Sequence, residues 1–242
     1  MKPPSPPLQN ALWVIPAGAV PCDTAPLCAA ERERAARYTH ERARARYVRG
    51  RVALRRILAM RLACRPRDIV LATRDGRPFL PDAPHLHVSL SHTPGWHAIA
   101  ISSHPVGVDI ERMDADFACE TVAAAWFHPR EKAFLAGLPA NARRRAFYAL
   151  WTQKEALVKA LGAGLGFPLD AFAVAHTGGP VHFEPGQHET GAWSTLAFGT
   201  IAGCSLAVAF PGAERPHWRV DTLPAAPAAE TLGDGHHAPA QG

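Results

Sequence analysis

Residues 86–111, LHVSLSHTPGWHAIAISSHPVGVDIE, hold three short strands in succession and define the centre of the fold. Leu86 to Ser91 alternates apolar and polar residues, which is the period of a half-buried strand. The turn residues 93–95 lead into a second strand, Ala98 to Ile101, so the two are predicted to form a hairpin. A third strand, Val106 to Ile110, follows directly.

Helical periodicity flanks this centre on both sides. Residues 29–63 are rich in Ala, Arg and Glu, carry an apolar stripe at helical spacing and end before a proline. A shorter helix is predicted after Phe127, with Pro129 at its first position. Residues 142–161 form the strongest helical pattern, and residues 162–166 end it. This order predicts an α+β fold of two similar lobes, a pseudo-dimer divided near residue 105.

The predicted domain organisation has four parts. We expect a flexible segment at 1–10, an N-terminal lobe at 11–105, a C-terminal lobe at 106–221 and a disordered tail at 222–242, because the tail is rich in Pro, Ala, Gly and His. The odd number of scattered cysteines predicts reduced thiols. We expect a cytoplasmic protein without a membrane partner, because the sequence shows neither a signal peptide nor a long apolar run.

The formal charge of +5 is unevenly distributed. Arginines concentrate between Arg32 and Arg67, and a second group lies at residues 143–145. Such concentrations predict an anionic partner, or alternatively a solvated basic helix. The 143–145 group is a candidate surface for an acidic protein partner.

Two carboxylates share one face of the third strand. In VGVDIE, strand alternation places Val108 and Ile110 on one side and Asp109 and Glu111 on the other. Paired carboxylates repel unless a cation, an arginine or open water relieves them, and oxygen ligands of this kind suit Mg²⁺. The pattern predicts either a metal site or a solvent-facing strand edge.

The helix around WTQKEALVK, residues 151–159, contains a second unusual arrangement. At 100° per residue, Lys154 falls within the apolar arc, whereas Glu155 and Lys159 lie on its flank. A buried ammonium is costly unless it is paired, so Lys154 is predicted to reach the rim or to meet an anion. Glu155 and Lys159 could also be an ordinary surface pair one helical turn apart.

Taken together, these motifs resemble one known family. VGVDIE, then FHPREKAFL, then WTQKEALVKALGAGLGFPLDAFAV resemble the two signature regions of the Sfp-type 4′-phosphopantetheinyl transferases. GRPFLP and VSLSHTPGWHAIAIS resemble the upstream motifs of that family, so the similarity runs from about residue 37 to 210. The resemblance implies a pseudo-dimer with its active site in the cleft between the lobes. It also implies a holo-[acyl-carrier-protein] synthase activity, in which the phosphopantetheine arm of coenzyme A is transferred to a serine of an apo carrier protein and adenosine 3′,5′-bisphosphate leaves.

The resemblance also implies roles for individual residues. Mg²⁺, or Mn²⁺ as a substitute, would be held by Asp109, Glu111 and Glu155. The general base would be Glu155 or a metal-bound water, which Glu131 would position. Lys159 would stabilise the leaving phosphate. Contacts to coenzyme A are expected from Arg46, Arg77, Ser91, His92, Lys154 and Lys159.

Further implications concern partners and one departure from the family pattern. Coenzyme A and an acyl or peptidyl carrier protein are expected as partners, from fatty acid, polyketide or non-ribosomal peptide synthesis, and the chain is expected to be a monomer that binds no nucleic acid. His128 stands where the family has Ser or Thr before the helix at Pro129, and histidine is a poorer cap.

Two other functions remain open on the residues alone. A metal-dependent nuclease or phosphohydrolase also gathers carboxylates around Mg²⁺ beside phosphate-binding cations. A basic module could instead bind nucleic acid through residues 32–67, without any need for Asp109 or Glu155.

Overall fold

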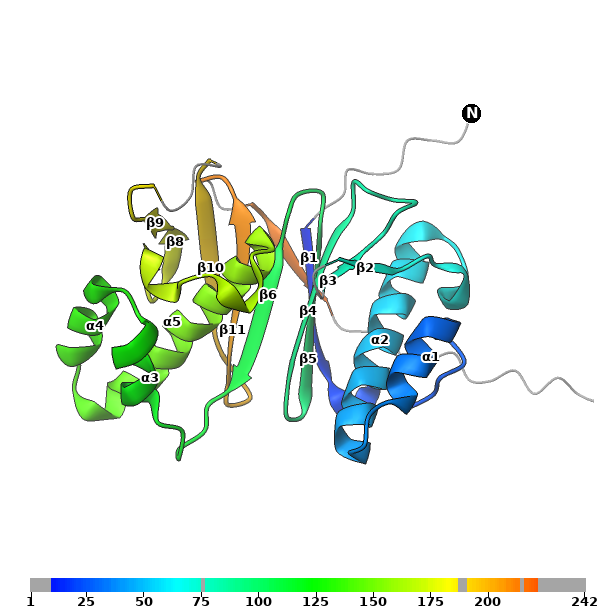
Figure 1. Cartoon of the computed structure of the whole chain (residues 1–242), viewed down its shortest axis with the longest axis horizontal. Helices are drawn as coiled ribbons and strands as arrows, with labels where there is room; N and C mark the ends of the chain where they lie inside the picture. The colour runs from blue at the N-terminus through cyan, green and yellow to red at the C-terminus, as the bar shows by residue number, and fades with distance from the viewer. Residues whose placement is uncertain (1–9, 75–76, 187–190, 214–215, 222–242) are drawn as a thin grey trace, which may run out of the picture.

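The computed structural model describes residues 10–74, 77–186, 191–213 and 216–221. Two lobes lie side by side, each with a four-stranded sheet covered on its outer side by helices (Figure 1). An apolar cluster that includes Leu12, Ala100, Val108 and Leu206 joins the inner faces of the two sheets. The layers therefore run helix, sheet, sheet, helix, and the predicted α+β fold of two lobes is confirmed.

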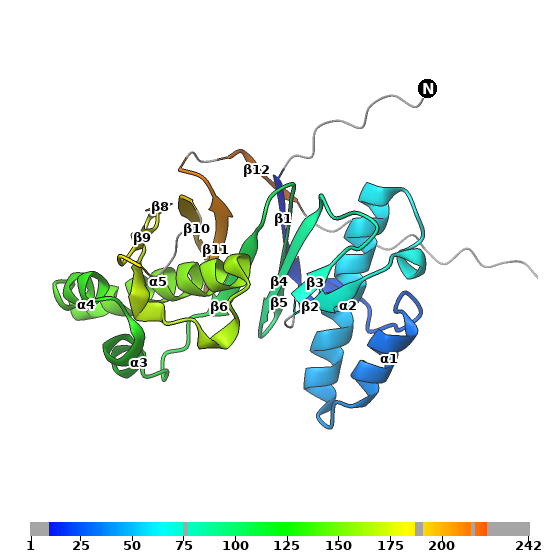
Figure 2. The same cartoon turned by 45° about the horizontal axis from the view of Figure 1, so that its top comes forward.

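The first lobe is built on a sheet of strand order β12-β1-β5-β4. The outer face of this sheet packs against α1 and α2 through an apolar cluster that includes Val52, Ile57 and Ile99. The small hairpin of β2 and β3 lies beside β4 (Figure 2). The bounds are β1 (Asn10–Pro16), α1 (Ala29–Ala36), α2 (Glu41–Leu62), β2 (Ala72–Arg74), β3 (Arg77–Phe79), β4 (His87–Thr93), β5 (Trp96–Ser102) and β12 (Trp218–Asp221).

The second lobe is built on a sheet of strand order β6-β11-β10-β8. Its outer face packs against α5 through a cluster that includes Phe147, Leu157 and Ala207, and α3 and α4 cover α5 in turn. The bounds are β6 (Gly107–Arg112), α3 (Cys119–Trp126), α4 (Pro129–Ala136), α5 (Ala140–Leu161), β7 (Phe172–Ala173), β8 (Gly178–Pro180), β9 (His182–Phe183), β10 (Trp193–Ile201) and β11 (Cys204–Pro211). Short 3₁₀ turns occupy residues 17–19, 66–68, 164–166 and 169–171.

The edges of the two sheets meet where β4 runs beside β6. Hydroxyl groups of β4 join them: Ser89 Oγ accepts a hydrogen bond from the backbone N–H of Val108 at 3.0 Å, and Thr93 Oγ1 accepts one from that of Arg112 at 2.9 Å. Between these two, Ser91 Oγ donates to Asp109 Oδ1 at 2.7 Å. The polar face predicted for the first strand of the hairpin is therefore a seam between the lobes.

The sequence predicted the hairpin and the long helix correctly. β4 and β5 pair in antiparallel register around a turn at Pro94 and Gly95, and the φ angle of Gly95 is +87°. α5 covers the whole of the predicted 142–161 helix. The single helix predicted over 29–63 is wrong, because the chain breaks at residues 37–40 and α1 folds back against α2.

The predicted extent of the C-terminal lobe needs one correction. β12 pairs in parallel with β1, so the last described strand belongs to the sheet of the first lobe and not to the lobe predicted over 106–221. The predicted flexible segment, apart from Asn10, and the predicted tail at 222–242 lie outside the described residues. In the described part of the chain, no helix is long and apolar enough to cross a membrane. All five cysteines are free thiols.

Candidate active site at the seam between the lobes

The close packing of α5 against β6 determines the geometry of the candidate site. A Cβ on Gly107 would lie only 1.8 Å from the backbone oxygen of Ala156, so glycine is required at the start of β6. The helix therefore lies directly on the strand. This brings the flank of α5 that carries Glu155 and Lys159 beside the carboxylates of β6.

Asp109 lies at the centre of the site and is 2% exposed. Lys159 Nζ stands 2.5 Å from Asp109 Oδ1 and also donates to Ser91 Oγ at 3.0 Å. Asp109 Oδ2 is buried and has no hydrogen-bond partner among the described residues. One oxygen of this carboxylate is thus neutralised, while the other is shielded from water and unsatisfied.

Three carboxylates share this neighbourhood and repel one another. Burial raises the pKa of Glu111 to about 7, and the charges of Asp109 and Glu155 contribute to the increase. Burial and then the charge of Asp109 also raise the pKa of Glu155. Negative charge is therefore held here against its own repulsion, which is the electrostatic situation that a bound cation relieves.

The carboxylates do not by themselves form a complete set of metal ligands. Within residues 10–74, 77–186, 191–213 and 216–221, no group of three or more His, Cys, Asp or Glu side chains is close enough to hold a metal ion. The donor set nevertheless fits Mg²⁺, because its members are carboxylates and one buried oxygen of Asp109 lacks a partner. Mg²⁺ commonly takes one or two protein carboxylates and completes its shell with water and substrate phosphates.

Positive charge borders the carboxylates on the side of the first lobe. His92 is exposed on β4, beside Ser91. Burial of its ring and the positive charges of Arg46 and Lys159 lower its pKa, partly opposed by a backbone hydrogen bond and by Asp109. Ser91 and Lys159 thus contact Asp109 directly, and the charges of Arg46, Lys159 and Asp109 all act on His92. The expected contacts of these residues with coenzyme A stay predictions.

Comparison with known proteins identifies the family. The profile of the 4′-phosphopantetheinyl transferase superfamily matches residues 105–208. The chain is 33% identical over 164 residues to 4′-phosphopantetheinyl transferase ffp of Bacillus subtilis, covering 67% of this chain and 72% of the relative. The chain belongs to this family.

Two further relatives agree. 4′-phosphopantetheinyl transferase Sfp of Bacillus subtilis (strain 168) is 33% identical over 161 residues, covering 65% of this chain and 71% of the relative. 4′-phosphopantetheinyl transferase HetI of Nostoc sp. is 32% identical over 194 residues, covering 78% of this chain and 80% of the relative. The Sfp-type resemblance seen in the motifs is thereby confirmed, and the chain is a phosphopantetheinyl transferase.

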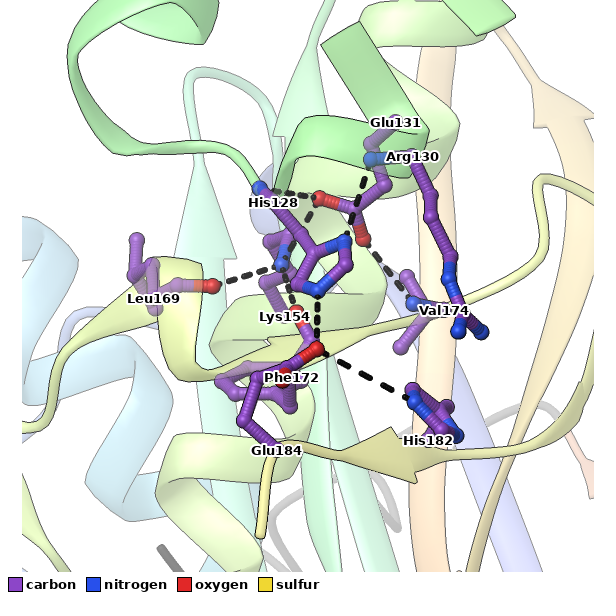
Figure 3. A network of polar contacts seen from close by, with 9 residues as sticks. All are labelled: His128, Arg130, Glu131, Lys154, Leu169, Phe172, Val174, His182 and Glu184. Carbon is purple, nitrogen blue, oxygen red and sulfur yellow. Dashed lines mark hydrogen bonds and ion pairs between the residues drawn. The ribbon is translucent and has the colours of Figure 1, made fainter. Parts of the chain in front are cut away.

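Lys154 and Glu131 of the transferase lie outside this group and need a correction. Lys154 is fully buried, and its Nζ is 2.8 Å from Glu131 and 2.7 Å from each of the carbonyl oxygens of Leu169 and Phe172 (Figure 3). Burial lowers the pKa of Lys154, whereas Glu131 opposes that decrease. The predicted phosphate contact of Lys154 is wrong, because the ammonium has no exposed surface and its partners are all from the protein.

Glu131 is committed to the same structural network. Its Oε2 also accepts the backbone N–H of His128 at 3.0 Å, and its Oε1 accepts that of Val174 at 2.9 Å (Figure 3). A carboxylate that is 2% exposed and whose two oxygens both accept protein donors is not available to position a catalytic water, so that prediction is wrong. The pair instead ties α4 to α5.

His128 makes a better cap than the sequence indicated. Its Nδ1 accepts the backbone N–H of Arg130 at 3.1 Å, and its Nε2 lies 2.7 Å from Glu184 Oε1 (Figure 3). With Glu131 bonded back to the N–H of His128, the helix start has a complete capping box. Histidine therefore replaces the hydroxyl residue without loss of the cap.

Arg77 of the transferase joins the lobes. From β3 in the first lobe, its Nη1 donates to the carbonyl oxygen of Lys159 at 2.5 Å, at the last turn of α5. Gly162 leaves room for the guanidinium, since a Cβ there would lie 1.7 Å from Arg77 Nη2. Sequence reasoning missed this positioning of Lys159, and the expected contact of Arg77 with coenzyme A stays a prediction.

Two arginines of the group at residues 143–145 form hydrogen bonds within the second lobe. Arg143 donates to the carbonyl oxygens of Leu138 and Ala136, and Arg144 to those of Asp114 and Phe117. Arg145 is exposed. Two of the three side chains thus hold the loops that flank α3 and α4.

Sequence reasoning also missed the hydrogen bonds that Ser89 and Thr93 make across the seam. The alternation of Ser89, Ser91 and Thr93 in β4 is the signal that could have indicated them.

Proposed function

We propose that this transferase moves the 4′-phosphopantetheine arm of coenzyme A to a serine of an apo acyl or peptidyl carrier protein. The observation that carries the proposal is the group formed by Asp109, Glu111, Glu155 and Lys159. In this group, three carboxylates and an ammonium of the second lobe share one site at the seam with the first lobe. Family membership supports phosphopantetheinyl transfer as the reaction.

The metal is assigned to the carboxylates on their chemistry. Asp109, Glu111 and Glu155 would hold Mg²⁺, with Mn²⁺ as a substitute. Bound there, the ion would supply positive charge for the diphosphate of coenzyme A. The unpaired Oδ2 of Asp109 and the raised pKa of Glu111 are the features that favour a cation at this place.

The protein side chains divide the remaining tasks. Lys159 donates to the phosphate oxygens on which negative charge develops, and Arg46, Ser91 and His92 orient the phosphates from the first lobe. Glu155 accepts the proton of the attacking serine hydroxyl, as a carboxylate positioned at the reacting group can do. The serine oxygen forms a bond to the phosphorus that bears pantetheine, the bond to the bridging oxygen breaks, and adenosine 3′,5′-bisphosphate leaves with the electron pair.

The direct test is an intact-mass assay with coenzyme A, Mg²⁺ and a panel of apo carrier proteins. The carriers gain the phosphopantetheine arm with the wild-type chain. With Asp109→Asn or Glu155→Gln, we expect the rate of transfer to fall at least about 100-fold, which is the size of effect seen when one electrostatic contact to the transition state is removed. Asp116→Asn and Glu33→Gln, at exposed positions, serve as matched controls with full activity.

Two outcomes would overturn the proposal. A fully active Glu155→Gln protein removes the base from the scheme. Release of adenosine 3′,5′-bisphosphate without any carrier indicates a phosphohydrolase, the rival function from the sequence. The cytoplasmic location and the monomeric state remain predictions, and light scattering of the purified chain tests the latter.

A further inference from the structure

His97 is a fully buried imidazole without a hydrogen-bond partner. It lies on β5, is 0% exposed, and neither of its ring nitrogens is bonded to any other part of the described chain. Buried polar side chains in native proteins are bonded in the large majority of cases. The exception therefore needs an explanation other than packing.

The fold makes room for this imidazole. Gly50 lies in the interior of α2, where glycine costs about 1 kcal/mol relative to alanine. A Cβ at that position would lie 3.3 Å from His97 Nδ1 and 3.4 Å from its Cε1. α2 therefore has a glycine at the position that packs on the His97 ring.

Among the described residues, the groups whose charge acts on the pKa of His97 are all basic. On β4, His92 is its cross-strand neighbour, with ring centroids 6.2 Å apart, and α2 contributes Arg46 and Arg49. The other paired strand, β1, contains no charged residue. Arg49 Nε is itself buried and without a partner in the described residues. Burial and then the charges of His92, Arg49 and Arg46 lower the pKa of His97 to about 4, and no carboxylate in the described part of the chain opposes them.

We propose that His97 is a buried proton acceptor that takes up one proton from solvent when phosphate groups of coenzyme A bind against Arg46, Arg49 and His92. This inference rests on the proposed function for the identity of the anion. A phosphate at the cations cancels the field that keeps the ring neutral and adds negative charge of its own, so both changes favour the imidazolium. Once protonated, the buried His97 ring adds a positive charge that strengthens binding of the anion.

The sign of the resulting pH dependence follows from linkage. Binding raises the pKa of His97 from its value in the free protein, so the bound state holds more protons. Affinity for the anion therefore increases as the pH falls towards the free-protein pKa of about 4, and it decreases as the pH rises through the pKa of the complex. The affinity should depend less steeply on pH once His97 is replaced, because one of the groups that take up a proton on binding is then missing.

Nuclear magnetic resonance of histidine rings tests the inference without catalysis. The chain is labelled at histidine Cε1, and the His97 signal is assigned by its absence from His97→Gln. Titration from about pH 3.5 to about pH 8 covers the free-protein pKa of about 4 and the usual range of histidine, and it is carried out with and without inorganic pyrophosphate, and then with coenzyme A. We expect binding to raise the His97 pKa from about 4 into the range of ordinary histidines, about 6–7, so that one proton is taken up at about pH 5.

Calorimetry in two buffers of different ionisation enthalpy gives a second readout, the number of protons taken up. Wild type and the matched control His85→Gln, at an exposed histidine, take up more protons per pyrophosphate than His97→Gln does. If pyrophosphate and coenzyme A bind while the His97 signal and the proton count stay unchanged, the inference is wrong and the proposed function stands. If neither ligand binds wild type, the proposed substrate itself is wrong.

Discussion

The two carboxylate oxygens of Asp109 differ in their hydrogen bonding. Lys159 and Ser91 bond to one of its oxygens, while the other is buried without a partner in the described chain. Burial of an unpaired carboxylate oxygen costs free energy, and the neighbouring Glu111 and Glu155 increase that cost. The arrangement therefore lowers the free energy of unfolding, as is common where charged groups are held in place for catalysis or binding.

Glu111→Gln should stabilise the metal-free chain. At about pH 8 the substitution removes a negative charge that repels Asp109 and Glu155, and we expect a gain of about 1 kcal/mol, or about 2–4 °C in Tm. Thermal unfolding with and without Mg²⁺ measures this. The same variant should lose most of the Mg²⁺-dependent increase in Tm, whereas Glu33→Gln keeps it. A lower Tm for Glu111→Gln without metal contradicts the prediction.

Lys154→Met tests the buried ion pair with Glu131. Removal of the ammonium leaves a buried carboxylate unpaired, so urea unfolding should show a loss of about 3–5 kcal/mol. The double variant Lys154→Met/Glu131→Gln should recover much of this loss, because no isolated charge remains. If Lys154→Met is instead as stable as wild type but has a raised KM for coenzyme A, the phosphate contact predicted from the sequence is restored.

The sequence placed Lys154 on the apolar side of its helix, and it left open whether the ammonium reaches the rim or meets an anion. Helical stepping placed the lysine in the apolar arc of α5, and that placement is local information. Glu131 belongs to α4 and also serves the capping box, and no periodicity reports which residues meet across two helices. The proposed metal ligands come from the motif resemblance, whereas the role of Gly107 and the Arg77 contact depend on packing distances that a sequence does not contain.

At the scale of elements, the contact between β6 and α5 defines the site. Gly107→Ala places a methyl group in the backbone of α5 at Ala156, so either the helix or the strand must move. We expect a loss of about 1–3 kcal/mol and a larger fall in transfer rate than in stability. Gly18→Ala, where a Cβ meets nothing within 4 Å, is the matched control. Equal behaviour of the two variants in unfolding and transfer assays would contradict the packing.

Elements with strong local signals were predicted well, and the error has an identifiable cause. The hairpin has a Pro-Gly turn and the long helix ends at Gly162, so both carry their own signals. The break between α1 and α2 is accompanied by long-range ion pairs, since Glu31 of α1 lies 2.8 Å from Arg51 and 2.5 Å from Arg55 of α2. Ala/Arg/Glu composition favours helix throughout and does not reveal the reversal.

At the scale of the whole molecule, Arg77 links the two lobes through the last turn of α5. Arg77→Ala removes the bond to the carbonyl of Lys159 and should lower the transfer rate about tenfold, because Lys159 loses its support. The exposed Arg67→Ala is the matched control. Transfer kinetics together with Tm measure the effect. A changed KM for coenzyme A with an unchanged kcat would instead favour a direct phosphate contact.

The return of β12 to the sheet of β1 also governs how the chain can be synthesised. On the ribosome, residues of the first lobe emerge long before residues 218–221, so one edge of β1 waits without its neighbour until nearly all of the second lobe has been translated. An open strand edge is a site for wrong association. Expression of the first 105 residues alone should therefore yield aggregated protein, whereas co-expression with the remainder should rescue it. The sheet of the first lobe is thus completed only by residues that follow the second lobe in the chain.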